Sequence, residues 1–381
     1  MFNTEIGTFC NLHENWRELL SVDPYNLKIK ENKEYVLFSY DQVKSDFSNP
    51  IVREARGIIF KKDYWQKPAC WPFTKFFNYG ESNAAQIDWS TAFVTEKIDG
   101  SLIKLWWNWS GGWHISTNGT IDAFEAPMSG IGYADFGTYF CSILIKQYDI
   151  SFSDLVEDLD IDCTYMFEIA GPQNRVVVPY EESMIYFLGA RNNYSGKEQD
   201  CLSNKVPRYI CRPRVYPLMS LEDCIKLAEE YSWDQEGFVV SDANFNRVKI
   251  KSPAYVRAHY MRNNYVVTRK RLVEVILANE EEEFLCYAKD YTDQIKHCKS
   301  LVNTYYTLGE MFAAAGRRAS RLSRAEYAEM VKCFPRIFQG LMFVNYEREC
   351  SVRDYTADWT SAKWDKHLDE VEKLRTLIGV D

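Results

Sequence analysis

Short runs of apolar residues separated by polar turns dominate the first part of the chain. Several runs that are rich in aromatic and branched side chains, or that alternate apolar with polar ones, predict strands. They are residues 35–40, 57–60, 165–169, 185–190, 237–241 and 247–251. Residues 101–107 and 112–117 predict a hairpin that turns at Ser110, Gly111 and Gly112.

Helices are predicted in three places before residue 250, and helical spacing dominates after it. Residues 15–20 and 136–148 predict helices, and Ser220 marks the start of a third. From Pro253 onward there is almost no strand pattern, and helices are predicted in four segments. They are residues 272–287, 291–315, 324–334 and 359–377. Ser323 and Glu326 have the spacing of a capping box. The expected fold is an α+β domain of antiparallel sheets and helices, residues 1–255, followed by an all-α domain, residues 256–381.

Five charged residues follow one another along the α+β region in an order that suits chemistry on a nucleotide. They are Lys97 in Lys97-Ile98-Asp99-Gly100, Glu168, Glu236 before Gly237, and the pair Lys249 and Lys251. A lysine, one residue, an aspartate and a glycine form a weak motif when taken alone. The complete ordered set resembles the lysine-adenylylating ligase superfamily, in which nucleotidyl transfer to a lysine is covalent.

The chemistry requires these residue types. A lysine is a nucleophile only as the neutral amine, and neighbouring cations favour that form. Lys249 and Lys251 alternate along one predicted strand, so both face the same side and can bind phosphate. Attack by Lys97 on ATP would give a lysine phosphoramidate of AMP and release pyrophosphate. Glu168 and Glu236 are the acidic groups expected to hold Mg²⁺ or Mn²⁺, or its waters.

Each residue also has a plainer interpretation. Lys97 is by default a surface lysine in a turn, and Glu236 before a glycine is a turn residue. Lys249 and Lys251 suit the edge of a sheet, where charges discourage aggregation. Glu168 within an apolar strand is harder to dismiss, because a buried carboxylate needs a partner.

Three upstream segments narrow the resemblance to the phage RNA ligase 1 family, whose members repair broken tRNA. They are Phe38-Ser39-Tyr40, Glu54-Ala55-Arg56-Gly57-Ile58-Ile59-Phe60 and Lys75-Phe76-Phe77-Asn78. The likeness covers about residues 35–260, and a helical tail fits it. It implies an ATP-dependent RNA ligase that forms lysyl-AMP on Lys97, transfers AMP to an RNA 5′-phosphate, and joins a 3′-hydroxyl to that phosphate. Nicked tRNA is the implied substrate.

The resemblance also implies roles for individual residues. Tyr40, Arg56, Lys75 and Glu96 would belong to the ATP site, and Phe187 and Arg191 would lie on the strand beside the adenine. Glu168 would contact the ribose or the metal, Glu236 the metal's water shell, and Lys249 and Lys251 the α-phosphate. Glu282 is the nearest match to a structural cation site, although a solvated acidic run explains it equally well. The sequence departs from the family at Asn118, where a basic residue is common; a neutral amide there can bond a ribose hydroxyl.

Composition, charge and cysteine content are compatible with an RNA ligase and limit its other properties. A net charge of −9 argues against a protein that coats nucleic acid, but not against an enzyme with a local basic cleft. No apolar run is long enough for a membrane span, and the N-terminus lacks a signal pattern. We therefore expect a cytoplasmic protein, located in the host cell if it is phage-encoded. No membrane partner and no protein partner are expected. The eleven cysteines form no C-x-x-C pair. Reduced thiols are expected, with pairing of Cys211 and Cys224, or of Cys286 and Cys298, as alternatives.

Two other classes of protein remain open. A DNA ligase or a capping guanylyltransferase would use the same motifs, but it usually continues into a strand-rich OB-fold rather than helices. A non-catalytic module that binds nucleotide or RNA ends would not need all five charged residues. Within the helical tail, residues 316–324 concentrate four arginines, and a second basic stretch runs from Arg257 to Arg271. These basic stretches predict contacts with folded RNA, with a solvated helix face as the alternative.

Overall fold

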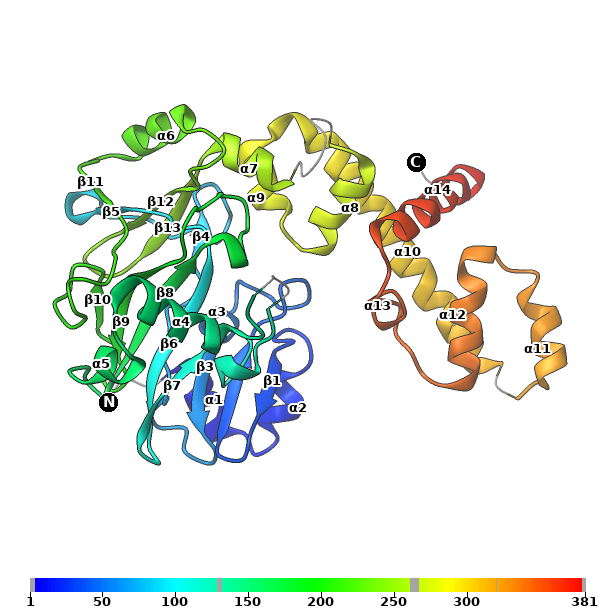
Figure 1. Ribbon diagram of the computed structural model, residues 1–381. Coiled ribbons are helices and arrows are strands. Elements are labelled where there is room, and N and C mark those ends of the chain that lie inside the picture. Colours follow the sequence, from blue (N-terminus) through cyan, green and yellow to red (C-terminus); the bar gives the residue numbers. More distant parts are fainter. Residues whose placement is uncertain (1–3, 129–131, 261–266, 320, 379–381) are drawn as a thin grey trace. The chain divides into compact units, whose positions relative to one another are not determined.

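The structure, a computed structural model, describes residues 4–128, 132–260, 267–319 and 321–378 (Figure 1). The chain divides into two compact units, Met1–His259 and Tyr260–Asp381. The first unit is α+β with three sheets, and the described part of the second is helical. The predicted fold class is therefore confirmed.

The N-terminal sheet has three antiparallel strands: β1 (Lys28–Glu31), β2 (Tyr35–Ser39) and β3 (Arg56–Lys61). All but the last residue of β2 are buried, because both faces of this strand are covered. One face packs on the helices α1 (Glu5–Leu12), α2 (Trp16–Leu20) and α3 (Pro50–Glu54). The other face packs on Trp106 of the next sheet. Helix α1, which the sequence pattern does not predict, begins after Thr4, whose side chain accepts a hydrogen bond from Gly7 N.

A five-stranded antiparallel sheet forms the centre of the first unit. Its strands, in spatial order, are β10 (Glu198–Asp200), β9 (Met184–Asn192), β8 (Cys163–Ala170), β6 (Ser101–Asn108) and β7 (Gly112–Ser116). Strands β6 and β7 form the predicted hairpin, and Gly111 at its turn has a φ of +99°. Helix α4 (Phe136–Tyr148), which has the predicted bounds, buries its apolar side against this sheet. Three short helices, η2 (Ala123–Glu125), α5 (Phe152–Val156) and η3 (Pro172–Asn174), complete the region.

The second five-stranded sheet carries the other half of the candidate site. Its order is β11 (Val215–Tyr216), β5 (Phe93–Glu96), β12 (Gly237–Ser241), β13 (Arg247–Lys251) and β4 (Phe77–Asn78), and only the β13–β4 pair is parallel. Helix α6 (Leu221–Glu230) covers one face, where it packs on Val248 and Ile250 of β13 (Figure 1). Because side chains alternate along a strand, Lys249 and Lys251 are left on the opposite face. A short helix, η1 (Trp89–Thr91), precedes β5.

Helices make up the rest of the described chain. They are α7 (Pro253–Tyr260), α8 (Arg269–Leu277), α9 (Glu281–Tyr287), η4 (Lys289–Tyr291), α10 (Thr292–Arg318), α11 (Arg324–Val331), α12 (Arg336–Glu347), α13 (Val352–Tyr355) and α14 (Ser361–Ile378). The single helix predicted over 272–287 is wrong: Asn279 has a φ of +55°, a left-handed conformation that ends α8 before α9 begins. The capping box of Ser323 and Glu326 is confirmed at the start of α11.

The structure also bears on cysteine pairing and on membrane-spanning helices. Cys211, Cys224 and Cys298 carry free thiols, so neither of the two alternative disulfides is formed. Among the residues that the structure describes, no helix combines the length and apolar character that crossing a membrane requires.

Candidate active site

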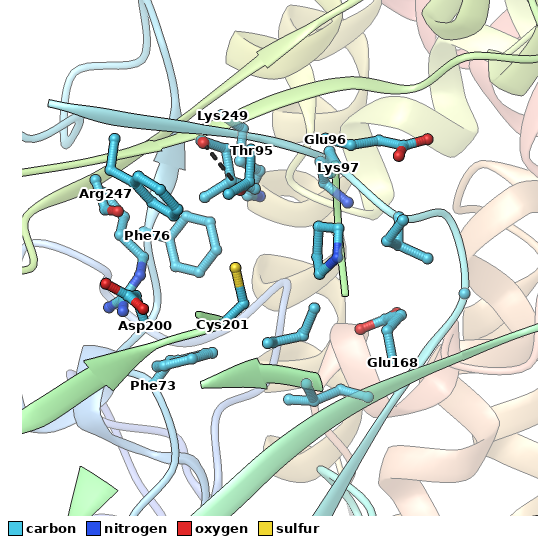
Figure 2. Close-up of a pocket in the computed structure, with 18 of the residues that line it drawn as sticks. Phe73, Phe76, Thr95, Glu96, Lys97, Glu168, Asp200, Cys201, Arg247 and Lys249 are labelled. Carbon is cyan, nitrogen blue, oxygen red and sulfur yellow. Dashed lines mark hydrogen bonds between the residues drawn. The ribbon is translucent and has the colours of Figure 1, made fainter. Parts of the chain in front are cut away.

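A cavity of about 320 Å³ lies in the first unit between its two five-stranded sheets (Figure 2). One wall comes from β5, β12 and β13, and the other comes from β6, β8, β9 and β10. Cations and carboxylates gather on these walls beside the aromatic rings of Phe73 and Phe76. The predicted site residues that line the cavity are Arg56, Glu96, Lys97, Glu168, Lys249 and Lys251.

Lys97 immediately follows β5 and is held by both its backbone and its side chain. Its backbone N–H donates to the carbonyl of Gly237, 2.8 Å away. Its Nζ donates to Oε2 of Glu236 at 2.7 Å. The Glu236 side chain is only 4% exposed and also contacts Lys251, whose Nζ lies 3.5 Å from Oε1. One carboxylate therefore joins the motif lysine to a lysine of β13.

Gly237 makes this arrangement possible. It has a φ of +128°, and a Cβ at this position would lie 2.2 Å from the carbonyl oxygen of Ile250. Only glycine permits both the conformation and the close approach of β12 to β13. The Glu236-Gly237 pair in the sequence thus reflects a backbone requirement next to a functional carboxylate.

Asp99 and Gly100 hold the loop after Lys97. Oδ2 of Asp99 accepts the backbone N–H groups of Val177 and Val178, each at 2.8 Å. Its Oδ1 accepts the hydroxyl of Tyr255, also at 2.8 Å. Asp99 is 5% exposed and is absent from the cavity lining, so it positions the loop rather than meeting a ligand. A Cβ on Gly100 would lie 2.1 Å from the carbonyl oxygen of Ile169, so this turn also requires glycine.

Glu168 is the one partly exposed residue of β8, since its carboxylate opens into the cavity. Desolvation at the cavity wall raises the pKa of Glu168 to about 8. The ammonium of Lys97 and the guanidinium of Arg56 lower this pKa, while the carboxylates of Glu236 and Asp99 raise it. Glu168 therefore lies within electrostatic reach of both cations.

Substituting Glu168 by glutamine is expected to flatten the dependence of stability on pH. The pKa of Glu168 is raised in the folded chain from its ordinary 4.5 to about 8, so between these values only the unfolded chain carries the charge. The stability of the native protein therefore falls as pH rises through this window. From pH 6 to pH 8 the melting temperature of Glu168→Gln should fall less than that of the native protein, by roughly 4–8 °C, because the two pKa values imply a loss of about 2 kcal/mol over this window. Equal falls in both proteins, measured by thermal melting, would contradict the assigned pKa. Glu54, whose pKa is raised to about 7 by burial, titrates in both proteins and cancels in the comparison.

Six predicted site residues lie outside this cavity lining: Tyr40, Lys75, Phe187, Arg191, Glu236 and Glu282. Nζ of Lys75 lies 4.7 Å from the centre of the Tyr40 ring. Lys75 and Arg191 border a second depression, which shares only Phe76 and Arg247 with the cavity. Phe187 is fully buried in the core of the central sheet, so on β9 it is Leu188 that faces the cavity.

Arg191 belongs to a buried ion-pair network. It and Arg247 both contact the carboxylate of Glu198, and its Nη1 donates to the carbonyl of Pro72 at 2.8 Å. These contacts link β9, β10 and β13, so the Glu198 carboxylate, which Arg191 holds, joins the two sheets through Arg247. The sequence pattern did not reveal Glu198 or Arg247 as members of this network.

Glu282, the predicted cation ligand, is an exposed residue in the first turn of α9 in the second unit. Its neighbour Glu281 is buried and lies 2.7 Å from Nζ of Lys299. Among the described residues, no three or more His, Cys, Asp or Glu side chains gather closely enough to hold a metal ion. A cation site at Glu282 stays a prediction.

Lys104 is a buried cation that belongs to none of the sequence motifs. It is fully buried on β6, where its Nζ donates to the carbonyl of Gly57 at 2.5 Å. Burial above all, together with the nearby Arg56 guanidinium, lowers the pKa of Lys104 to about 8. Its burial could have been predicted from its place inside the apolar run 102–107, where a buried lysine requires a partner.

The first unit thus combines an α+β fold with a lysine-rich cavity between two sheets. A family model described as RNA ligase, of the phage RNA ligase 1 type, matches residues 54–255, more than half of the chain. The chain belongs to this RNA ligase family.

Comparison with individual proteins gives modest similarity. The chain is 28% identical over 298 residues to a putative bifunctional polynucleotide kinase/RNA ligase of Autographa californica nuclear polyhedrosis virus, covering 74% of this chain but only 41% of that protein. It is 25% identical over 321 residues to an RNA ligase of Rhodothermus phage RM378, covering 66% and 72% of the two chains. Among solved structures, an archaeal ATP-dependent RNA ligase has a TM-score of 0.45 at 13% identity, covering 77% of this chain and 78% of that one.

Proposed function

We propose that this chain is an ATP-dependent RNA ligase that forms a covalent lysyl-AMP on Lys97. The observation that carries the proposal is the cavity in which Lys97, Glu168, Lys249 and Lys251 meet, with Glu236 bonded to Lys97 and Lys251. In the first step Nζ of Lys97 attacks the α-phosphorus of ATP. A P–N bond forms, the bond to the bridging oxygen breaks, and pyrophosphate leaves with its electron pair.

The residues around Lys97 suit this step. The attacking amine must lose a proton, and Oε2 of Glu236 lies 2.7 Å away to accept it. Lys249 and Lys251 face the space in which the α-phosphate would lie and can neutralise the charge that develops there. The RNA 5′-phosphate would then displace Lys97 from AMP, and a 3′-hydroxyl would displace AMP from the RNA end.

The carboxylates fit a divalent cation bound together with the nucleotide. Mg²⁺ is typically held by one or two carboxylates together with phosphate oxygens and waters, and Glu168 and Glu236 supply two near Lys97. Such an ion would neutralise charge on the phosphates during transfer. Mg²⁺ or Mn²⁺ would meet this requirement.

Incubation with ATP, Mg²⁺ and RNAs that carry a 5′-phosphate and a 3′-hydroxyl tests the assignment. Joined RNA is expected, whereas the same ends on DNA should be joined poorly or not at all. Preferential joining of DNA would indicate the DNA ligase alternative, and transfer of GMP would indicate a capping enzyme. Nucleotide binding without an adduct or product would leave only a binding module.

We further propose that the second unit selects a cleaved tRNA. Support comes from the basic run at the end of α10, where Arg318 and Arg321 are exposed. Arg317 instead makes a hydrogen bond within the unit: its Nη1 donates to Oδ1 of the buried Asn345 at 2.7 Å. Arg324 lies 3.1 Å from Glu347. In the second basic stretch, Arg269 and Arg271 are also bonded to carboxylates, and Arg262 lies outside the described residues.

Reversing the charge of Arg318 and Arg321 is expected to weaken the ligation of nicked tRNA. Two lost phosphate contacts correspond to roughly a tenfold loss at moderate salt, and the dependence on salt should become shallower. Short linear RNA should be joined almost as before, and the adduct should form normally. The matched control reverses Lys332 and Lys366, two exposed lysines of the same unit. Equal losses on both RNAs, or the same loss in the control, would remove this basic run from substrate selection.

A further inference from the structure

Two buried polar atoms on the cavity wall have no hydrogen-bond partner among the described residues. They are the donor Nη1 of Arg56 and the acceptor Oδ1 of Asn118. Both residues line the cavity. Buried polar groups are almost always paired, because an unpaired one loses its hydration without compensation. A donor and an acceptor left unpaired on one wall therefore point to a ligand that pairs with both.

Backbone contacts hold these two residues together. Gly57, which follows Arg56, has a φ of +78°, and a Cβ there would lie 2.8 Å from the carbonyl oxygen of Asn118. Lys104 approaches the same glycine from the buried side and donates to its carbonyl at 2.5 Å. The start of β3 and the loop after β7 thus form one fixed wall, in which the buried ammonium of Lys104 keeps Gly57 in place.

The wall belongs to the end of the cavity at which transfer would occur. The guanidinium of Arg56 and the ammonium of Lys97 both act electrostatically on Glu168. Figure 2 shows Lys97 and Glu168 on one side of the cavity and Phe73, Asp200 and Arg247 on the other. With the α-phosphate at Lys97, the next part of a nucleotide along this wall is its ribose.

We propose that Arg56 and Asn118 together bind a hydroxyl of the ribose of ATP, and that Asn118 thereby selects ribonucleotides over deoxyribonucleotides. A hydroxyl donates to an amide oxygen and accepts from a guanidinium through a single oxygen atom. With the amide of Asn118 as it stands, a phosphate, which offers acceptors only, would leave Oδ1 unpaired, whereas a hydroxyl pairs with both atoms. The inference rests on the proposed nucleotidyl transfer and adds a residue that fixes which nucleotide is used.

The test measures the rate of adduct formation with ATP, 2′-deoxyATP, 3′-deoxyATP and GTP. The native protein should use one of the two deoxynucleotides about tenfold to a hundredfold less efficiently than ATP, and that nucleotide identifies the hydroxyl. Asn118→Leu should lower the rate with ATP to the level of that deoxynucleotide, whose own rate should not change. Asn118→Ala is measured alongside, with thermal melting of each variant, so that a folding defect in one does not decide the result.

Thr117→Val is the matched control. The hydroxyl of Thr117 bonds to Thr120 within the same loop, and its side chain is absent from the cavity lining. This variant disturbs the loop without removing the amide and should retain the preference for ATP.

Three results would overturn the inference while leaving the proposed function intact. The native protein could use ATP and both deoxynucleotides equally, or Asn118→Leu could slow all three by the same factor. A loss confined to the choice between ATP and GTP would assign Asn118 to the edge of the base. Absence of any adduct with ATP in the native protein would instead refute the proposed function itself.

Discussion

Replacing Lys97 by arginine is expected to abolish the protein–AMP adduct while the joining of pre-adenylylated RNA stays measurable. Arginine remains protonated and has no lone pair with which to attack phosphorus. The rate of adduct formation should therefore fall on the order of a thousandfold or more, as for other lost nucleophiles. The last step differs, because the nucleophile is then the 3′-hydroxyl of the RNA. Arginine also keeps a positive charge beside Glu236, so that this buried carboxylate retains a partner.

Lys226→Arg is the matched control for this substitution. Lys226 is an exposed residue of α6, and its replacement should preserve both reactions. A native level of adduct in Lys97→Arg would exclude Lys97 as the acceptor. Equal loss of adduct formation and of joining would indicate a collapsed cavity rather than a missing nucleophile.

The second large effect is expected at Lys251, and a smaller one at Lys249. Lys251 shares the carboxylate of Glu236 with Lys97, at 3.5 Å from Oε1, which places it close to the reacting amine. Nζ of Lys249 instead lies 5.6 Å from the centre of the Phe76 ring. Removal of a charge that stabilises a transition state typically costs a factor of about 10²–10³. Lys251→Ala should lose this much in adduct formation, and Lys249→Ala should lose less.

Single-turnover adduct formation and the joining of pre-adenylylated RNA separate the steps at which the two lysines act. Lys251→Arg retains the charge and should recover part of the rate, which a purely structural role would not predict. Full activity of both alanine variants in both assays would show that β13 does not contact the reacting phosphate.

The sequence predicts a site residue best where its functional group stands out against a recognisable strand pattern. The alternation of Lys249 and Lys251 along β13 follows from strand geometry alone, and Glu168 stands out as a carboxylate within an apolar strand. The structure brings these three residues together with Lys97. It also places Lys75 and Arg191 at a second depression, a position that depends on how β4 and β9 pack and that no local pattern encodes.

The fold shows the same division between local and distant information. Helix α4 and the β6–β7 hairpin are predictable because their caps, turns and apolar spacing are all local. The parallel pairing of β4 with β13 joins segments about 170 residues apart, and only the folded chain determines it. The left-handed Asn279 that separates α8 from α9 is similarly hidden, since asparagine is also compatible with a continuous helix.

The most direct test of lysyl-AMP formation is mass spectrometry of the native protein after incubation with ATP and Mg²⁺. The intact protein should carry one adenylyl group per chain, and peptide mapping should place this group on Lys97. Addition of pyrophosphate should then remove it, because the phosphoramidate forms reversibly. Failure to detect an adduct, or an adduct that maps to Lys104, Lys249 or Lys251 instead, would contradict the account.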